Sequence, residues 1–162
     1  MVLWQAVIRL NSSERKMPVA SATILADTMF FIRDFLRTNI TDPITRLANE
    51  QFIMTSYPQL PTSYPLITIK DLNITSESLG LQSEDQWITL TIEIRVWGRN
   101  VVERAEIAQD IVDELRSRMV TLSSSQAMHN YRFGSMVNVD EPGDQGIKSK
   151  ILNIEFDAVL GE

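Results

Sequence analysis

Cysteine is absent from this chain, and histidine occurs only once, at His129. Without cysteine there is no disulfide, no thiolate nucleophile and no cysteine-ligated zinc or iron–sulfur site. A single histidine cannot build a histidine-rich metal site. Glycine is also scarce, with 6 residues in 162, and none of them belongs to a phosphate-binding loop. We therefore expect no metal, no other cofactor and no enzyme activity.

Long apolar runs are missing as well. No stretch approaches the roughly 20 apolar residues that are needed to cross a bilayer. The first ten residues lack a basic opening and are interrupted by Arg9, so they make a poor signal peptide. These features predict a soluble protein that is made in the cytoplasm and has no membrane partner.

Positive charge is short in the C-terminal part of the chain. The net charge is −6, and residues 101–162 carry six Lys or Arg against eleven Asp or Glu. Residues 1–50 are nearly balanced, with six against five. Tight binding to phosphate backbones relies on clustered Lys and Arg. We therefore expect no tight DNA binding, although such a surface is compatible with nucleic acid that passes without binding.

The clearest pattern in the chain is a strand followed by a helix. From Trp87 to Trp97 apolar and polar residues alternate, which is typical of an antiparallel sheet covered on one face. A helix is predicted from Asn100 to Met119, and Asn100 with Glu103 resembles a capping box at its start. The apolar stripe expected to face the sheet consists of Val101, Ala105, Ala108, Val112, Leu115 and Met119.

The rest of the chain predicts one more helix and four more strands. The helix spans 21–39, because Pro43 disfavours its continuation. The predicted strands span 51–57, 66–75, 127–139 and 150–160. We interpret 1–20 as an N-terminal arm or short strand and 21–162 as a single domain. The order helix, three strands, helix, two strands predicts an α+β fold, with two main helices packed on one face of a mostly antiparallel sheet.

Side chains able to do acid–base chemistry are present, but their spacing favours a structural interpretation. The candidate carboxylates, all at solvent-face spacing on the second helix, are Glu103, Glu106, Asp110, Asp113 and Glu114. We interpret them as a solvated face, because a carboxylate needs burial to shift its pKa. His129 opens a strand with no Ser or Cys motif nearby, and we expect no catalytic role for it.

Aromatic and arginine residues are the better candidates for a functional surface. Trp87 and Trp97 fall on the polar face of their strand, where a tryptophan is covered either by its own chain or by another subunit. Arg95 and Arg99 beside Trp97 have the composition of an interface anchor. Two further arginines on the first helix either bind a partner's carboxylates or lie on a solvated face. The candidate interface residues are therefore Trp87, Arg95, Trp97, Arg99, Arg33 and Arg37.

Several segments in the first two thirds of the chain carry a family resemblance. They are Phe31-Ile-Arg-Asp-Phe-Leu-Arg37, Asn39-Ile-Thr-Asp-Pro43, Phe52-Ile-Met-Thr-Ser-Tyr-Pro58, Tyr64-Pro-Leu-Ile-Thr-Ile-Lys70 and Val96-Trp-Gly98 with the helix from Asn100. In this order they resemble the tail-terminator, or tail-completion, proteins of long-tailed bacterial viruses and the related neck subunits. The resemblance covers roughly 21–119 and consists of element order and residue types, not of a catalytic signature.

The resemblance implies a structural role in the virion. Members of this family form rings of identical subunits, commonly hexamers, at the head-proximal end of the tail, where they stop polymerisation of the tail tube. The partners implied are further copies of the chain, the tail tube protein and the head-side connector or neck protein, while DNA passes through unbound. The implied location is the virion tail or neck, after synthesis in the host cytoplasm. The alternatives are another neck or connector ring subunit, or a non-viral α+β domain that binds a ligand or acts as an adaptor.

Overall fold

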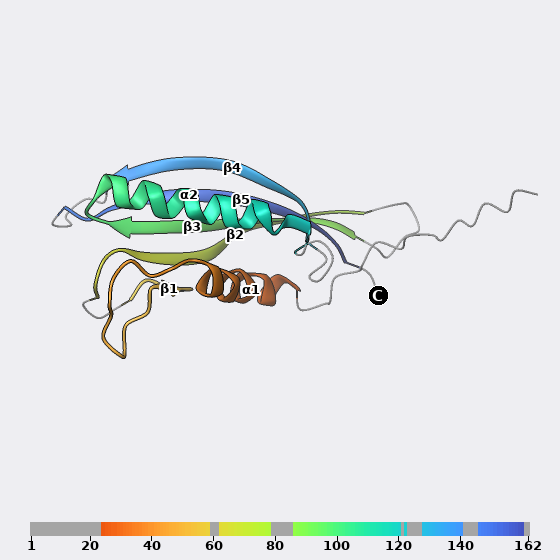
Figure 1. Ribbon diagram of the computed structural model, residues 1–162. Helices are drawn as coiled ribbons and strands as arrows, with labels where there is room; N and C mark the ends of the chain where they lie inside the picture. Colours follow the sequence, from red (N-terminus) through yellow and green to blue (C-terminus); the bar gives the residue numbers. More distant parts are fainter. Residues whose placement is uncertain are drawn as a thin grey trace, which may run out of the picture.

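Within the residues that it describes, the computed structural model contains one five-stranded sheet and two helices. It describes residues 24–58, 62–78, 86–120, 122, 128–140 and 146–160. The elements are α1 (Ile24–Asn39), β1 (Ile53–Met54), β2 (Leu66–Ser78), β3 (Gln86–Gly98), α2 (Val101–Ser117), β4 (His129–Asp140) and β5 (Lys148–Leu160). The strands are ordered β1-β2-β3-β5-β4, and every neighbouring pair is antiparallel except β1 with β2 (Figure 1). The predicted α+β fold and its element order are confirmed. The arm predicted at 1–20 lies outside the described residues.

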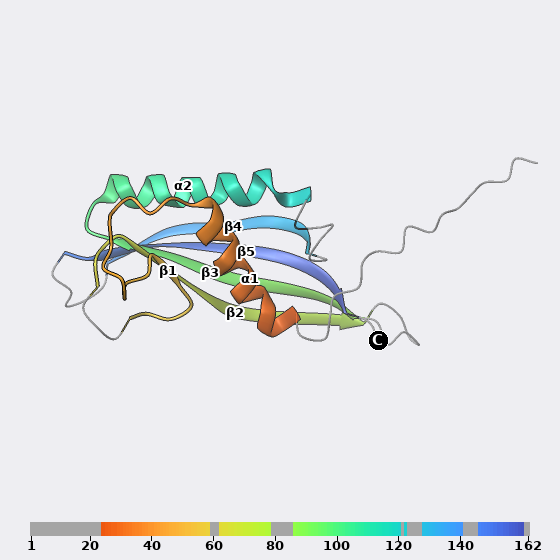
Figure 2. The same cartoon turned by 60° about the horizontal axis from the view of Figure 1, so that its bottom comes forward.

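Both helices pack on the same face of the sheet. α2 lies along β3 and β5, and α1 crosses β1 and β2 (Figure 2). Ile32 of α1 and Ile111 of α2 are completely buried in one continuous core with Ile94 of β3. Burying a side chain of this size stabilises a fold by about 1.5–3 kcal/mol. One shared core therefore holds the two helices and the sheet together.

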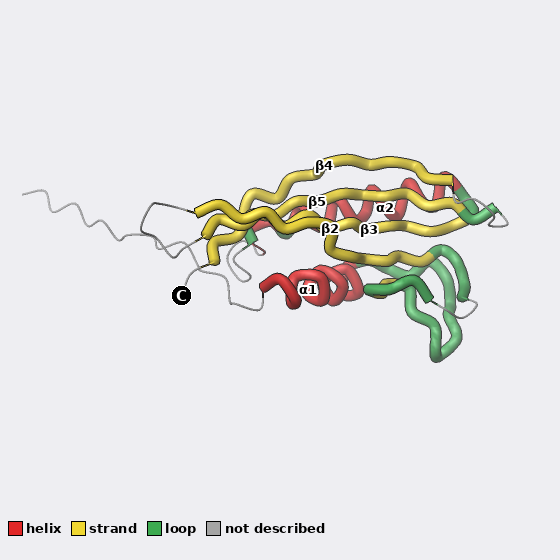
Figure 3. The backbone as a smooth tube through the Cα atoms, turned by 180° about the vertical axis from the view of Figure 1, so that it is seen from behind, coloured by secondary structure: helices red, strands yellow, loops and turns green. Residues whose placement is uncertain are grey.

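The alternation predicted for β3 is confirmed by the register of the sheet. Ile94 lies between Ile69 of β2 and Leu152 of β5, and all three side chains are buried. Their polar neighbours point to the opposite face, because successive side chains of a strand alternate. We call this opposite face, which no described helix covers, the open face. It is turned toward the viewer in Figure 3, where β3 and β5 lie in front of α2.

The start of α2 is predicted correctly, but its buried stripe is not. The side chain of Asn100 accepts hydrogen bonds from the backbone N–H groups of Val102 (2.9 Å) and Glu103 (3.5 Å), as an N-cap does. The buried residues are Arg104, Ile107, Ala108, Ile111 and Leu115. Val101 and Met119 are instead 61 % and 42 % exposed. This rotation of the helix buries two isoleucines in place of alanine and valine, and so removes more apolar area from water.

The strand predicted over 51–57 is much shorter, because only Ile53–Met54 pair with β2. Ile53 pairs with Ile67, and the carbonyl of Phe52 accepts a hydrogen bond from the N–H of Ile67 at 2.7 Å. Pro58 has no N–H with which to continue a ladder. The chain instead leaves the sheet edge after β1 and places Tyr57 against the open face.

Candidate interaction surfaces

Three of the predicted interface residues share the open face of the sheet. Trp87, Arg95 and Trp97 occupy alternate positions of β3, so their side chains leave the strand on the same side. Arg99 lies one residue beyond the end of β3 and is exposed. Arg33 belongs to α1, as does Arg37, and this helix packs on the other face. The six predicted residues are therefore distributed over three places and do not form one surface.

Trp97 is partly covered by its own chain. The ring of Tyr57 lies 4.8 Å from the Trp97 ring, centroid to centroid, and the guanidinium carbon of Arg95 lies 5.1 Å from the same ring. The indole Nε1–H donates to the hydroxyl of Thr68 at 2.9 Å. Of the two alternatives for Trp97, cover by its own chain is thus realised. A contact of its remaining exposed surface with another subunit stays a prediction.

Charged residues on the open face neutralise one another. Glu93, which is 7 % exposed, forms ion pairs with Lys70 at 3.2 Å and with Arg95 at 3.1 Å. Because two cations contact it, the buried carboxylate is compensated within the subunit. Arg95 therefore already contacts Glu93 and the ring of Trp97 within the subunit. It is less available to bind a partner than the sequence suggests.

A second polar cluster joins β4 to the middle of the sheet. Asp157 is 2 % exposed and accepts hydrogen bonds from Thr89 (2.8 Å), Asn130 (3.0 Å) and Arg132 (2.8 and 2.9 Å). Burial alone would raise the pKa of Asp157, but these hydrogen bonds outweigh it, so the pKa lies below its usual value. Arg132 also pairs with Glu155 at 3.2 Å. The cluster fixes β4 to β5 and β3 and leaves no carboxylate of this group without a partner.

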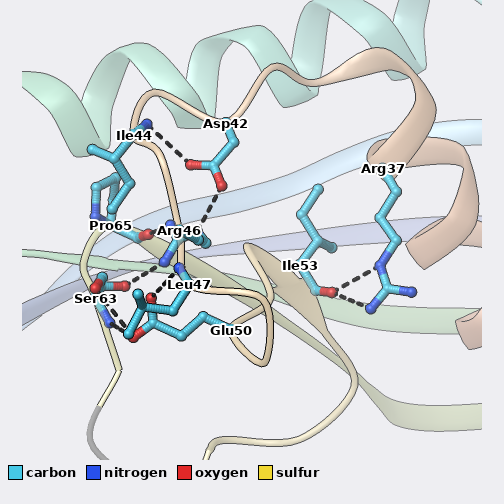
Figure 4. A network of polar contacts seen from close by, with 9 residues as sticks. All are labelled: Arg37, Asp42, Ile44, Arg46, Leu47, Glu50, Ile53, Ser63 and Pro65. Atoms are coloured by element: carbon cyan, nitrogen blue, oxygen red, sulfur yellow. Dashed lines mark hydrogen bonds and ion pairs between the residues drawn. The ribbon is translucent and has the colours of Figure 1, made fainter.

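A network of hydrogen bonds fastens the segment between α1 and β2 to the end of the sheet (Figure 4). Arg46, whose side chain is 6 % exposed, donates to Asp42 at 2.6 Å and to the carbonyls of Ser63 (2.5 Å) and Pro65. Glu50 accepts the N–H and the hydroxyl of Ser63, each at 3.2 Å. The loop at 41–50 is therefore held by a buried arginine that the sequence pattern does not reveal.

The two arginines of α1 are engaged inside the subunit. Arg37 donates from Nε and Nη2 to the carbonyl of Ile53, at 2.9 and 2.7 Å (Figure 4). Arg33 pairs with Asp34 at 2.7 Å and lies 5.0 Å from the ring of Phe30. The Asp34 hydrogen bond raises the pKa of Arg33, and the Arg33 hydrogen bond lowers the pKa of Asp34. Binding of a partner's carboxylates by these arginines remains a prediction.

Sequence reasoning misses Arg104, the largest fully buried side chain of α2. Arg104 is 2 % exposed, and its Nη1 donates to the carbonyl of Gly98 at 2.5 Å. Its Nε has no partner, and no carboxylate contacts it within the part of the chain that the structure describes. The sequence carries one sign of this burial. Arg104 lies at helical spacing from Ala108, Ile111 and Leu115, so it completes the buried stripe of α2 although it is charged.

The carboxylates of α2 form the remaining candidate surface. Glu106, Asp110 and Asp113 are exposed, in agreement with the solvated face predicted for them. Asp110 and Asp113, with Glu114, line one wall of a pocket of about 190 Å³, and the opposite wall consists of Asn39, Ile40 and Thr41 at the end of α1. Within the described residues, no group of three or more His, Asp and Glu is arranged to hold a metal ion.

Comparisons with known proteins add no family to these observations. No protein-family model matches the sequence, and no curated protein is significantly similar to it. No helix in the described ranges is long and apolar enough to span a membrane. The element order, the open face and the charged surfaces of α2 are thus the features on which a functional proposal can rest.

Proposed function

We propose that this chain is a tail-terminator or tail-completion subunit of a long-tailed bacterial virus. Copies of it form a ring, a hexamer, at the head-proximal end of the tail. The ring stops polymerisation of the tail tube and joins the tail to the head-side connector. DNA passes through the ring without specific binding, and the protein acts as a structural part of the virion.

The observation that carries this proposal is the element order along one compact α+β unit. The family resemblance depends on a helix, strands, a second helix and further strands, and α1 through β5 follow this order. The strand that ends in Val96-Trp-Gly98 and the helix capped by Asn100 form adjoining elements of the fold, as the resemblance requires. The charged and aromatic surfaces of the subunit also suit a protein whose role is to contact other proteins.

Another neck or connector ring subunit is the second candidate, because it would use the same ring of α+β subunits. A ligand-binding domain would need a site between sheet and helices, yet the described residues fill that space with apolar side chains such as Ile94 and Ile111. An adaptor would act as a monomer or dimer. Particle mass in solution separates an adaptor from a ring, and the position in the virion separates a terminator from a neck subunit.

The decisive experiment locates the protein in virus particles. A label fused to the C-terminus should appear in negative-stain images at the head-proximal end of the tail, and particles with untagged protein are the control. Virus that lacks the protein should make tubes of unregulated length and heads without tails. Label at the distal tail tip or over the capsid shell, or tails of normal length without the protein, would overturn the proposal.

A further inference from the structure

The outer edge of β4 has no partner strand among the residues that the structure describes. β4 is the last strand in the order of the sheet, and β5 is its only described neighbour (Figure 3). Every second residue of an edge strand turns its N–H and C=O groups away from the sheet. Such a row of groups can pair with a strand of another molecule, and natural proteins usually protect it with charge, proline or bulges.

The two halves of β4 differ in this protection. Register shifts interrupt the pairing with β5 between His129 and Arg132 and again between Phe133 and Ser135. From Ser135 onward the residues of β4 pair with β5 one by one, without a further shift. Residues 135–139, Ser-Met-Val-Asn-Val, include no charged residue and no proline. We call this regular, uncharged stretch the edge segment.

The edge segment presents apolar side chains on the open face of the sheet. Val137 is 50 % exposed and pairs with Ile151, which in turn pairs with Arg95 of β3. Val139 points the same way as Val137, because it lies two residues further along the strand, and it is half-buried. A strand added at this edge would cover Val137, and a β-branched neighbour on the same face would stabilise the pair.

Charge and residue pattern favour a second copy of the chain as the added strand. Each copy carries a net charge of −6, so two copies repel unless they meet through a surface with little charge, and the edge segment is such a surface. The pattern also matches itself. In an antiparallel pair about a two-fold axis at Val137, this residue lies opposite its own counterpart, and Ser135 lies opposite Val139. All three side chains lie on the open face, so the two sheets join with the same face on the same side.

The free part of β2, on the other side of the sheet, does not match the edge segment. Across β5 and β3 the edge segment is level with residues 66–70 of β2, where β1 already pairs with Ile67 and Thr68. Residues 73–78 of β2 have no described outer neighbour, but they begin level with Arg132, in the irregular half of β4. Pairing of β4 with β2 of another copy would therefore need a long slide along the strands.

We propose that two copies of this chain associate by antiparallel pairing of their edge segments about a two-fold axis at Val137. The contact joins the two sheets into one continuous sheet and covers Val137 of both copies. Because the contact is isologous, it closes with two copies and is separate from the head-to-tail contacts of the proposed ring. The inference goes beyond the proposed function and does not depend on it.

Substitutions at Val137 test the axis directly, because this residue faces its own counterpart. Val137→Lys and Val137→Glu each place like charges opposite one another, whereas an equimolar mixture of the two variants places lysine opposite glutamate. Thr75→Lys and Thr75→Glu, exposed on the same face at the free part of β2, are the matched controls. All are made in the full chain, and thermal melting checks that each is folded. Self-association is measured by sedimentation equilibrium at low salt, where charges are weakly screened.

Wild type and both Thr75 variants should form dimers. Each Val137 variant alone should dimerise about tenfold more weakly or worse, because like charges directly opposite in a strand pair are destabilising. The mixture should recover most of the association of the wild type. A structural effect of the substitutions would not be reversed by mixing.

Val137→Cys gives a second readout, since the chain has no cysteine of its own. Residues directly opposite in an antiparallel pair have Cα atoms about 4.5–5.5 Å apart, which is within the range of a disulfide. A mild oxidant should therefore link Val137→Cys into a covalent dimer, and it should link Thr75→Cys much less.

A monomeric wild type would overturn the inference, and so would Val137 variants that dimerise as well as the wild type. A mixture that does not recover association would also overturn it, because the contact would then lie away from a two-fold axis at Val137. Weaker association of the Thr75 variants would overturn it in favour of pairing between β4 and β2. None of these results bears on the ring, which is tested separately by the position of the label in virus particles.

Discussion

Replacing Arg104 by methionine should stabilise the isolated subunit. Arg104 is 2 % exposed and makes one hydrogen bond, to the carbonyl of Gly98. Desolvation of an ion without a counter-ion costs several kcal/mol, and one hydrogen bond from a charged group returns about 1.5–3 kcal/mol. Methionine has a flexible apolar chain that can fill the same space. We expect the free energy of unfolding to rise by about 1–3 kcal/mol, and each kcal/mol to raise Tm by about 2–4 °C.

Arg46 supplies a matched control, because it is a second buried arginine close to Pro65. A Cβ built on Gly98 would contact the side chains of both Arg104 and Pro65, and Arg46 donates to the Pro65 carbonyl. Arg46 also pairs with Asp42 at 2.6 Å. Arg46→Met removes every one of these bonds and leaves Asp42 without its cation. This variant should lose about 2–4 kcal/mol of stability.

The assay is urea denaturation of both variants, at a salt and protein concentration where the wild type is monomeric. This choice matters because self-association would stabilise the folded state by mass action. If the slope of the unfolding free energy against urea concentration is the same in the variants and the wild type, the compactness of the unfolded state is unchanged. If Arg104→Met is less stable than the wild type, the reasoning that nothing offsets the desolvation of the Arg104 guanidinium is refuted.

Three further predictions concern the core, acid stability and DNA. Ile92→Ala should lower the free energy of unfolding by about 2–5 kcal/mol. Trp97→Ala should lower it by only about 1–2 kcal/mol, because the Trp97 ring is half-buried. Equal melting temperatures of the two variants would place Trp97 in the core. The pKa of Asp157 is lower in the folded state, so its contribution is present above the unfolded value of about 3.9 and is lost as the pH falls through the folded value. Asp157→Asn should therefore flatten the loss of stability as the pH falls below the unfolded pKa of about 3.9, and an unchanged pH profile would contradict this. Duplex DNA should give no tight gel shift at moderate salt, whereas a strong shift that weakens steeply with salt would contradict the charge argument.

The fold could be predicted because its strands and helices have clear apolar periods. The alternation of Ile92, Ile94 and Val96 specifies one covered face, and Asn100 specifies the start of α2. Which side of α2 faces the sheet could not be predicted in the same way. Ala108 and Leu115 belong to both possible stripes, and the choice between them depends on how the helix lies on β3 and β5, which is a tertiary property.

The candidate interface was harder to predict, because the partners of a charged side chain come from distant parts of the chain. Arg37 binds a carbonyl sixteen residues away, and Trp97 donates to a hydroxyl twenty-nine residues away. No local pattern in the sequence shows that Tyr57 covers Trp97. Side-chain type alone therefore identifies candidates for an interface, and the three-dimensional contacts decide which of them are already occupied.

The ion pairs already formed within the subunit separate Arg99 from the charged residues of the open face. On the open face Glu93 and Asp157 are neutralised by Lys70, Arg95 and Arg132, so docking another charged group there would break existing ion pairs. Arg99 is exposed, and no ion pair joins it to another described residue. Forming a new ion pair from two unpaired groups loses less than exchanging one pair for another. Of the six residues predicted from the sequence, Arg99 is therefore the one that we expect to carry a contact between subunits of the proposed ring.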